Sequence, residues 1–354
     1  MPKTDQEEAD DNRAYLEWTQ GFYTHLGTFS NPAFLQTAGW YWLTRGNDKV
    51  RAEQLFARAA KLPDLDAPSL FVTAVLCTQQ LDWNLCAGSD WNQRLLAADP
   101  GNAAVYLLQM RPAAAEPEPD SKQKPSWDTP ENRAWLTQAA AANTLTYYWG
   151  AHGTSLFRAA RDYQSQHPYP SPNPELVDAQ QASSAASVDW GLVSALFAAL
   201  EGPLRDPGYR FGAVIQLCKS QFKQGSPELL KSCQELAELA WTASREFVQM
   251  ELAREQFRMR DEVTGKQDYA ALLQNSQQLQ MCQAPAWQTQ NNGLQRISED
   301  SIRLLLAEIE QFGEIEAMRR AAIRDFETHP EAYASNPADC NDFELPSIDW
   351  ALNE

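Results

Sequence analysis

The sequence predicts an all-α protein, and three observations carry this prediction. Helix start signals recur, with a capping side chain directly before proline at Asn31-Pro32, Thr129-Pro130 and Ser226-Pro227. Apolar residues follow each signal at helical spacing. We find no Asn-Gly or Asp-Gly hairpin between two runs that alternate apolar and polar residues, so nothing indicates a sheet.

Segments that interrupt the helical pattern divide the chain into five parts. We expect a disordered acidic N-terminus over 1–12, helical pairs over 13–111, a linker or loop over 112–128, a second helical region over 129–328 and an irregular C-terminal tail over 329–354. Proline-rich connections join the helices, and four prolines in 167–174 predict an extended crossing segment. In the second region we expect helices near 175–200, 208–223, 227–262, 266–281 and 295–328.

The first third is predicted to consist of paired antiparallel helices, 31–43 with 48–62 and 68–80 with 86–98. A helix ending in Leu-Ala-Ala-Asp-Pro-Gly-Asn-Ala, residues 96–103, then leads into another helix. This junction resembles the one between tetratricopeptide (TPR) or Sel1-like repeats, in which Asp-Pro closes one helix and Asn-Ala opens the next. The resemblance covers residues 31–110 and implies a TPR-like or Sel1-like array. The chain departs from it because it has no fixed 34-residue period, and an ordinary irregular helical domain is the alternative.

The charge limits the kind of partner. The chain carries 47 acidic and 29 basic residues, a formal charge of −18. Nucleic acid and anionic membrane surfaces would be repelled, so we expect neither as a partner. No apolar run approaches the ~20 residues of a membrane helix, so we expect no membrane insertion. The negative charge has two possible roles. It keeps the protein soluble, or it attracts a basic protein partner. The oligomeric state stays open.

Six cysteines bear on the compartment in which the protein folds. Cys218 lies eight residues before the cap Ser226 and Cys233 seven after it, so an antiparallel hairpin would bring them together. Cys77 and Cys86 similarly straddle a turn near residues 81–82. The remaining candidates for a disulfide are Cys282 and Cys340. The alternative is six buried free thiols.

A cysteine-flanked hairpin before the Asp-Pro-Gly-Asn-Ala turn also resembles exported repeat proteins of Gram-negative bacteria, over residues 67–110. Some families of that type are immunity proteins against secreted toxins. The resemblance, with disulfides, implies a bacterial periplasmic protein. Because residues 1–11 have no apolar core and do not form a signal peptide, the chain is predicted to be either a mature exported form or cytoplasmic.

The search for catalytic chemistry finds one segment. Tyr148, Trp149, His152 and Ser155 gather an imidazole, a hydroxyl and aromatic rings, and they could line a small-molecule pocket. A nucleophile elbow and a phosphate-binding loop are missing, so no catalytic residue is assigned. No cysteine has a histidine at ligand spacing, so neither a metal site nor a cofactor is expected. Aromatic residues also cluster early in the chain, and in a repeat array some would line the concave surface: Trp18, Phe22, Tyr23, Phe29, Phe34, Trp40, Tyr41 and Trp42.

These features predict a non-enzymatic helical scaffold that binds a basic protein through an acidic, aromatic-bearing surface. Its specific form would be a periplasmic immunity or adaptor protein that neutralises a basic secreted effector. Two alternatives remain. One is an enzyme of divergent helical fold with a pocket near His152, and the other is a cytoplasmic regulatory scaffold.

Overall fold

The computed structural model of the chain describes residues 5–113 except 64, 80 and 81, residues 126–170 and 189–200, residues 211–265 except 225 and 244, and residues 297–333 and 335–339, together with positions 269, 270, 273, 274 and 285. Every regular element in these ranges is a helix. The β-structure within them is one isolated bridge between Asn102 and Thr144. The all-α prediction is therefore confirmed.

Six helices form the first part of the chain, and their starts follow the local capping chemistry. The Asn31 side chain accepts a hydrogen bond from the Phe34 N–H at the start of α2, and Asp48 accepts one from the Arg51 N–H at the start of α3. The helices are α1 (Asp5–Leu26), α2 (Pro32–Thr44), α3 (Lys49–Ala60), α4 (Ala67–Gln79), α5 (Trp91–Ala98) and α6 (Ala103–Leu107). Helix α1 thus begins inside the segment 1–12 for which the sequence predicts disorder.

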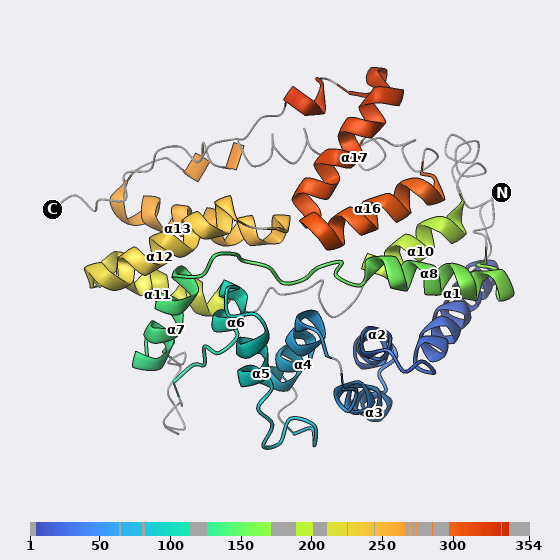
Figure 1. Cartoon of the computed structure of the whole chain (residues 1–354), viewed down its shortest axis with the longest axis horizontal. Helices are drawn as coiled ribbons and strands as arrows, with labels where there is room; N and C mark the ends of the chain where they lie inside the picture. Colours follow the sequence, from blue (N-terminus) through green and yellow to red (C-terminus); the bar gives the residue numbers. More distant parts are fainter. Residues whose placement is uncertain are drawn as a thin grey trace.

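The later helices lie above and beside the first group (Figure 1). They are α7 (Pro130–Ala140), α8 (Gly153–Gln166), α10 (Trp190–Leu200), α11 (Phe211–Gln224), α12 (Pro227–Thr242), α13 (Phe247–Thr264), α16 (Glu299–Phe312) and α17 (Glu314–Thr328), followed by short 3-10 turns over Pro330–Ala332 and Pro337–Asp339. Among these described helices, none combines the length and apolar character needed to cross a bilayer.

Three predicted helices have different bounds in the structure. The helix expected over 86–98 begins only at Trp91, because residues 82–90 form turns that insert Trp83 into the core, where 1% of its surface stays exposed. The helix expected over 227–262 is divided in two, because α12 ends at Thr242 and α13 begins at Phe247. The helix expected over 295–328 breaks at Gly313, whose φ of 90° is open only to glycine. Of the helix expected over 266–281 the structure describes only positions 269, 270, 273 and 274, which are helical, and most of the linker 112–128 lies outside the described residues.

Two apolar cores hold the helices together. The first contains residues of α4 to α7 and α11 to α13, and the second contains residues of α1 to α4, α8, α10, α16 and α17. Helix α4 belongs to both, because Phe71 faces the first core and Leu76 the second. A helix that is apolar on all sides is expected to be buried, and residues 70–76 of α4 are buried without exception.

The connection between α7 and α8 crosses the middle of the molecule in an extended conformation (Figure 1). Leu145 and Tyr147 of this segment enter the first core, and Trp149 packs against the second. Consecutive helices pack on each other, as α2 does on α3, α12 on α13 and α16 on α17. Helix α8 also packs on α1, and α7 packs on α12. The assignment to a repeat family stays a prediction.

Two disulfides join the predicted pairs. Cys77 of α4 is bonded to Cys86, with their Cα atoms 5.2 Å apart, and Cys218 of α11 is bonded to Cys233 of α12, with 5.8 Å between Cα atoms. The second disulfide is fully buried, with 0% exposure at both residues. Cys282 and Cys340 lie outside the described residues.

Candidate functional site

An aromatic cleft between α1, α10 and the chain after α8 is the strongest candidate site. Its volume is about 240 Å³. Helix α1 contributes five of the lining residues and α10 three, and Arg45 after α2 and Tyr169 after α8 complete the lining. The lining residues are Tyr15, Trp18, Thr19, Phe22, Tyr23, Arg45, Tyr169, Ser194, Phe197 and Ala198.

The helical repeat of α1 places its part of the lining. Tyr15, Trp18, Thr19 and Phe22 recur at spacings of three and four residues, so they share one face of the helix. Trp18 and Phe22 stack with ring centroids 5.7 Å apart. The Trp18 indole N–H donates to the carbonyl of His167 at 2.8 Å, which attaches the end of α8 to α1. Ring stacking with Phe22 and the hydrogen bond to His167 therefore fix the position of Trp18 in the lining.

Tyr169 contacts α1 through its aromatic ring. Tyr169 lies edge-on to Trp18 with 4.9 Å between ring centroids, and edge-on to Tyr15 with 6.2 Å. Burial raises the pKa of the Tyr169 phenol, Tyr15 raises it further, and a hydrogen bond with Ser194 lowers it. The phenol is consequently neutral at physiological pH and can donate a hydrogen bond.

The rim of the cleft exposes large apolar side chains to solvent. Tyr15 is 41% exposed and Phe197 53% exposed, and the neighbouring Leu16 on α1 is 51% exposed. These three belong to a group of only seven exposed large hydrophobic residues in the described part of the chain. Exposed apolar groups gathered around a concavity mark interaction sites, whereas single ones need no explanation.

A second cleft of about 330 Å³ opens between α16 and α17. Ser298 and Ser301 line its α16 side, and Asp325 and His329 line its α17 side. Arg324, also in the lining, makes two hydrogen bonds of 2.7 Å to the Glu308 carboxylate, so its charge is already matched. Fewer aromatic groups line this cleft than the first, and it offers a less specific site.

A buried polar junction lies where three distant segments meet. Glu246 precedes α13 and is 2% exposed. Its carboxylate accepts a hydrogen bond of 2.6 Å from the Thr146 hydroxyl and one of 3.4 Å from the Tyr147 N–H. Asn102 binds both the N–H and the carbonyl of Thr146 through its side chain. The junction thus connects the start of α6, the crossing segment and the start of α13.

Two ionisable groups at this junction have strongly raised pKa values. The pKa of Glu246 is raised to about 7: burial is the largest cause and Glu314 adds to it, while the hydrogen bonds from Thr146 and Tyr147 and the charge of Arg245 lower it. Burial also raises the pKa of Tyr148, whose hydroxyl binds the Asp99 carboxylate. A buried carboxyl that titrates near neutrality can serve acid–base chemistry. The linings of the two clefts do not include Glu246.

The segment for which the sequence predicts a possible small-molecule pocket, residues 148–155, forms part of this junction and of the turn into α8. Tyr148 has a φ of 60°, which is unusual for a residue other than glycine. The Ser155 hydroxyl donates to the backbone carbonyl of His152 at 2.9 Å, and the His152 Nε2 lies 3.7 Å from an Asp66 carboxylate oxygen. Trp149 packs against the second core. The Ser155 hydroxyl is therefore engaged by the backbone and not by an imidazole.

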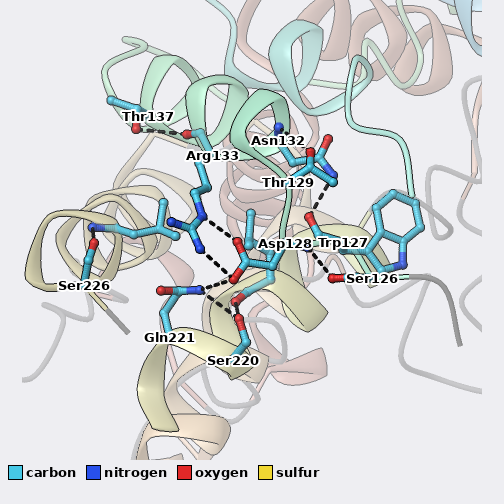
Figure 2. A network of polar contacts seen from close by, with 12 residues as sticks. Ser126, Trp127, Asp128, Thr129, Asn132, Arg133, Thr137, Ser220, Gln221 and Ser226 are labelled. Atoms are coloured by element: carbon cyan, nitrogen blue, oxygen red, sulfur yellow. Dashed lines mark hydrogen bonds and ion pairs between the residues drawn. The ribbon is translucent and has the colours of Figure 1, made fainter. Parts of the chain in front are cut away.

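A further polar network fastens α7 to α11 (Figure 2). The Asp128 carboxylate accepts two hydrogen bonds from Arg133, of 2.6 and 2.9 Å, and one of 3.2 Å from Gln221. Asn132 donates to the carbonyls of Arg111 and Trp127. The Arg133 guanidinium holds the pKa of Asp128 below its usual range. Because each member bonds to another within the network, we assign it a structural role.

The structure brings some predicted residues to the cleft and leaves others away from it. Of the early aromatic group, Trp18, Phe22 and Tyr23 line the cleft, and Tyr41 stacks on Tyr23 with 4.2 Å between ring centroids. Sequence reasoning missed Tyr15, Tyr169 and Phe197. Tyr15 could have been found, because it precedes Trp18 by three residues on the same helix. In the described part of the chain, no three His, Cys, Asp or Glu side chains are grouped as metal ligands.

Comparison with known proteins returns no match. No family model matches the chain, and neither a curated protein nor a solved structure matches it significantly.

Proposed function

We propose that this protein is a non-enzymatic helical scaffold, of TPR-like or Sel1-like type, that binds a basic protein partner through the aromatic cleft and the acidic surface around it. The observation that carries the proposal is the cleft itself, whose lining combines the exposed Tyr15 and Phe197 with the buried rings of Trp18, Phe22 and Tyr23. Tyr and Trp are the residue types that contribute most to binding energy at protein interfaces.

The charge of α1 supports a basic partner. The first two turns of this helix contain Asp5, Glu7, Glu8, Asp10 and Asp11 in the sequence, and the whole chain carries a formal charge of −18. Such a field speeds association with a positively charged protein and selects against acidic ones. The specific form of the proposal is an immunity or adaptor protein for a basic secreted effector.

The disulfides support an oxidising compartment, for which we propose the bacterial periplasm. Disulfides persist in secreted and periplasmic proteins and are rare in the reducing cytosol. Non-reducing mass spectrometry of protein isolated from its host tests this part. Retention of the Cys77–Cys86 and Cys218–Cys233 bonds would agree with it, and free thiols at these four positions would contradict it.

The binding function is tested by affinity capture from host extract with a salt titration. We expect one dominant basic protein that is retained at low salt and released as the salt concentration rises, because salt screens the attraction between charges. Absence of a retained protein at low salt would contradict the proposal. A retained protein of acidic composition would contradict its electrostatic part.

A further inference from the structure

We propose that the aromatic cleft is an anchor pocket for one aromatic side chain of the partner, and that Lys or Arg residues flank this side chain in the partner sequence. The inference rests on the proposed binding function and adds to it the chemical identity of the group that enters the cleft.

The size of the cleft favours a single side chain. Pockets for drug-sized ligands and cofactors measure roughly 300–1,000 Å³. The cleft measures about 240 Å³ and is therefore below this range. It is still far larger than the space of one or two water molecules, each of which occupies about 30 Å³. One bulky side chain on a partner surface matches this volume.

The walls of the cleft favour an aromatic ring. Aromatic pairs prefer edge-to-face or offset contacts with centroids about 4.5–7 Å apart. Tyr169 already makes such edge contacts with Trp18 and Tyr15, at 4.9 and 6.2 Å. Phe197 also lines the cleft and is 53% exposed, so it offers a further ring that an entering aromatic group would contact.

Polar groups within the cleft suit the N–H of an indole or the O–H of a phenol. Ser194 and Tyr169 form a hydroxyl pair in the lining, and the Thr19 hydroxyl donates to the Tyr15 carbonyl at 2.8 Å. Each hydroxyl oxygen retains the capacity to accept a further hydrogen bond. A tryptophan or tyrosine would thus be held more specifically than a leucine.

The distribution of charge places the partner's cations outside the cleft. Arg45 belongs to the lining, so a Lys or Arg side chain entering the cleft would meet a residue of like charge. Glu17 of α1 lies two residues after Tyr15 and has a side chain that is 72% exposed, and the whole chain carries a formal charge of −18. Lys or Arg next to the aromatic anchor would meet this negative charge, which is the complementarity that a basic partner needs.

The experiment uses the full chain and a fluorescein-labelled peptide, acetyl-Lys-Lys-Trp-Lys-Lys-amide, with binding followed by anisotropy. Three comparison peptides replace the Trp by Ala, replace the Trp by Arg, or replace all four Lys by Glu. We expect the Trp peptide to bind roughly tenfold or more tightly than the Ala peptide, because buried aromatic anchors dominate interface energetics. The Arg and Glu peptides should bind more weakly than the Trp peptide.

Two variants and a matched control locate the binding. Phe197→Ala removes an exposed rim ring and should weaken the Trp peptide by roughly threefold or more. Ser194→Trp fills the cleft and should abolish the preference for Trp over Ala. Phe29→Ala, at a residue 37% exposed outside the lining, should leave the affinity unchanged. Circular dichroism and the thermal midpoint show that each variant is folded.

The outcomes separate this inference from the proposed function. Equal binding of the Trp and Ala peptides would overturn the inference, and tighter binding of the Arg peptide would replace the aromatic anchor by a cationic one. If Ser194→Trp still captures the native basic partner, the scaffold function stands and the anchor pocket falls. If no partner is captured by any variant or by the unaltered chain, the scaffold function itself falls.

Discussion

Neutralising the buried carboxyl of Glu246 should change how the stability of the protein depends on pH. Burial raises the pKa of this group from 4.5 to about 7 in the folded protein. A raised pKa means that the folded state binds a proton that the unfolded state releases. The stabilising effect is therefore complete below pH 4.5 and is lost as the pH rises through 7.

The size of the effect follows from the two pKa values. Each pKa unit corresponds to about 1.4 kcal/mol, so a rise from 4.5 to about 7 corresponds to about 3 kcal/mol of unfolding free energy. We expect Glu246→Gln to remove this loss, because an amide keeps an acceptor for the Thr146 hydroxyl and carries no charge. Between pH 5 and pH 8 the variant should gain about 3 kcal/mol relative to the unaltered chain.

Urea denaturation at pH 5, 6, 7 and 8, followed by tryptophan fluorescence, measures this difference. Carboxyls with a lowered pKa, such as Asp128 and Glu299, lose their contribution to stability only at more acidic pH, so they do not affect the comparison between pH 5 and pH 8. Glu17→Gln is the control, because its side chain is 72% exposed, and its curve should follow that of the unaltered chain. Parallel pH curves for Glu246→Gln and the unaltered chain would refute the reasoning.

Three further predictions concern the stability of the fold. Gly313→Ala should destabilise the fold by roughly 2 kcal/mol or more, because φ is 90° and an added Cβ would lie 2.7 Å from the Arg245 carbonyl oxygen. Gly212→Ala in α11, where an added Cβ would have nothing within 4 Å, should stabilise the fold by about 0.5–1 kcal/mol. Thermal unfolding measures both changes, and equal effects would contradict the geometry. Graded treatment with a dithiol, followed by alkylation and mass spectrometry, should open the half-buried Cys77–Cys86 bond before the fully buried Cys218–Cys233 bond; the reverse order would contradict the burial argument. Asp128→Asn should lower the unfolding free energy by about 1 kcal/mol or less at pH 7, because the side chains of Arg133 and Asp128 are 50% and 27% exposed. A loss of several kcal/mol in urea denaturation would contradict this prediction and show that the ion pair is more strongly coupled to the fold.

The candidate site shows how far sequence reasoning reaches. The early aromatic residues were expected to include binding residues, and Trp18, Phe22 and Tyr23 do line the cleft. Tyr169 and Phe197 reach it from the end of α8 and from α10, more than 140 residues further along the chain. Only the packing of α1 against α8 and of α8 against α10 brings them there. No local pattern contains that information.

Features that depend on residues close together in the chain could be predicted from the sequence. Asn31, Thr129 and Ser226 cap helices as predicted, because a cap and the N–H that it binds lie three residues apart. The Cys218–Cys233 bond was also within reach, since both residues belong to one hairpin and their distances from its turn are nearly equal.

Features that depend on residues far apart in the chain could be seen only in the tertiary structure. It broke the helix expected over 227–262 at the point where Glu246 meets Thr146, because a carboxylate 100 residues away in sequence satisfies that hydroxyl. It broke the helix expected over 295–328 at Gly313, where the Arg245 backbone leaves no room for a side chain. Burial then set the pKa of Glu246, since desolvation of a charge is a property of the assembled core and of no segment alone.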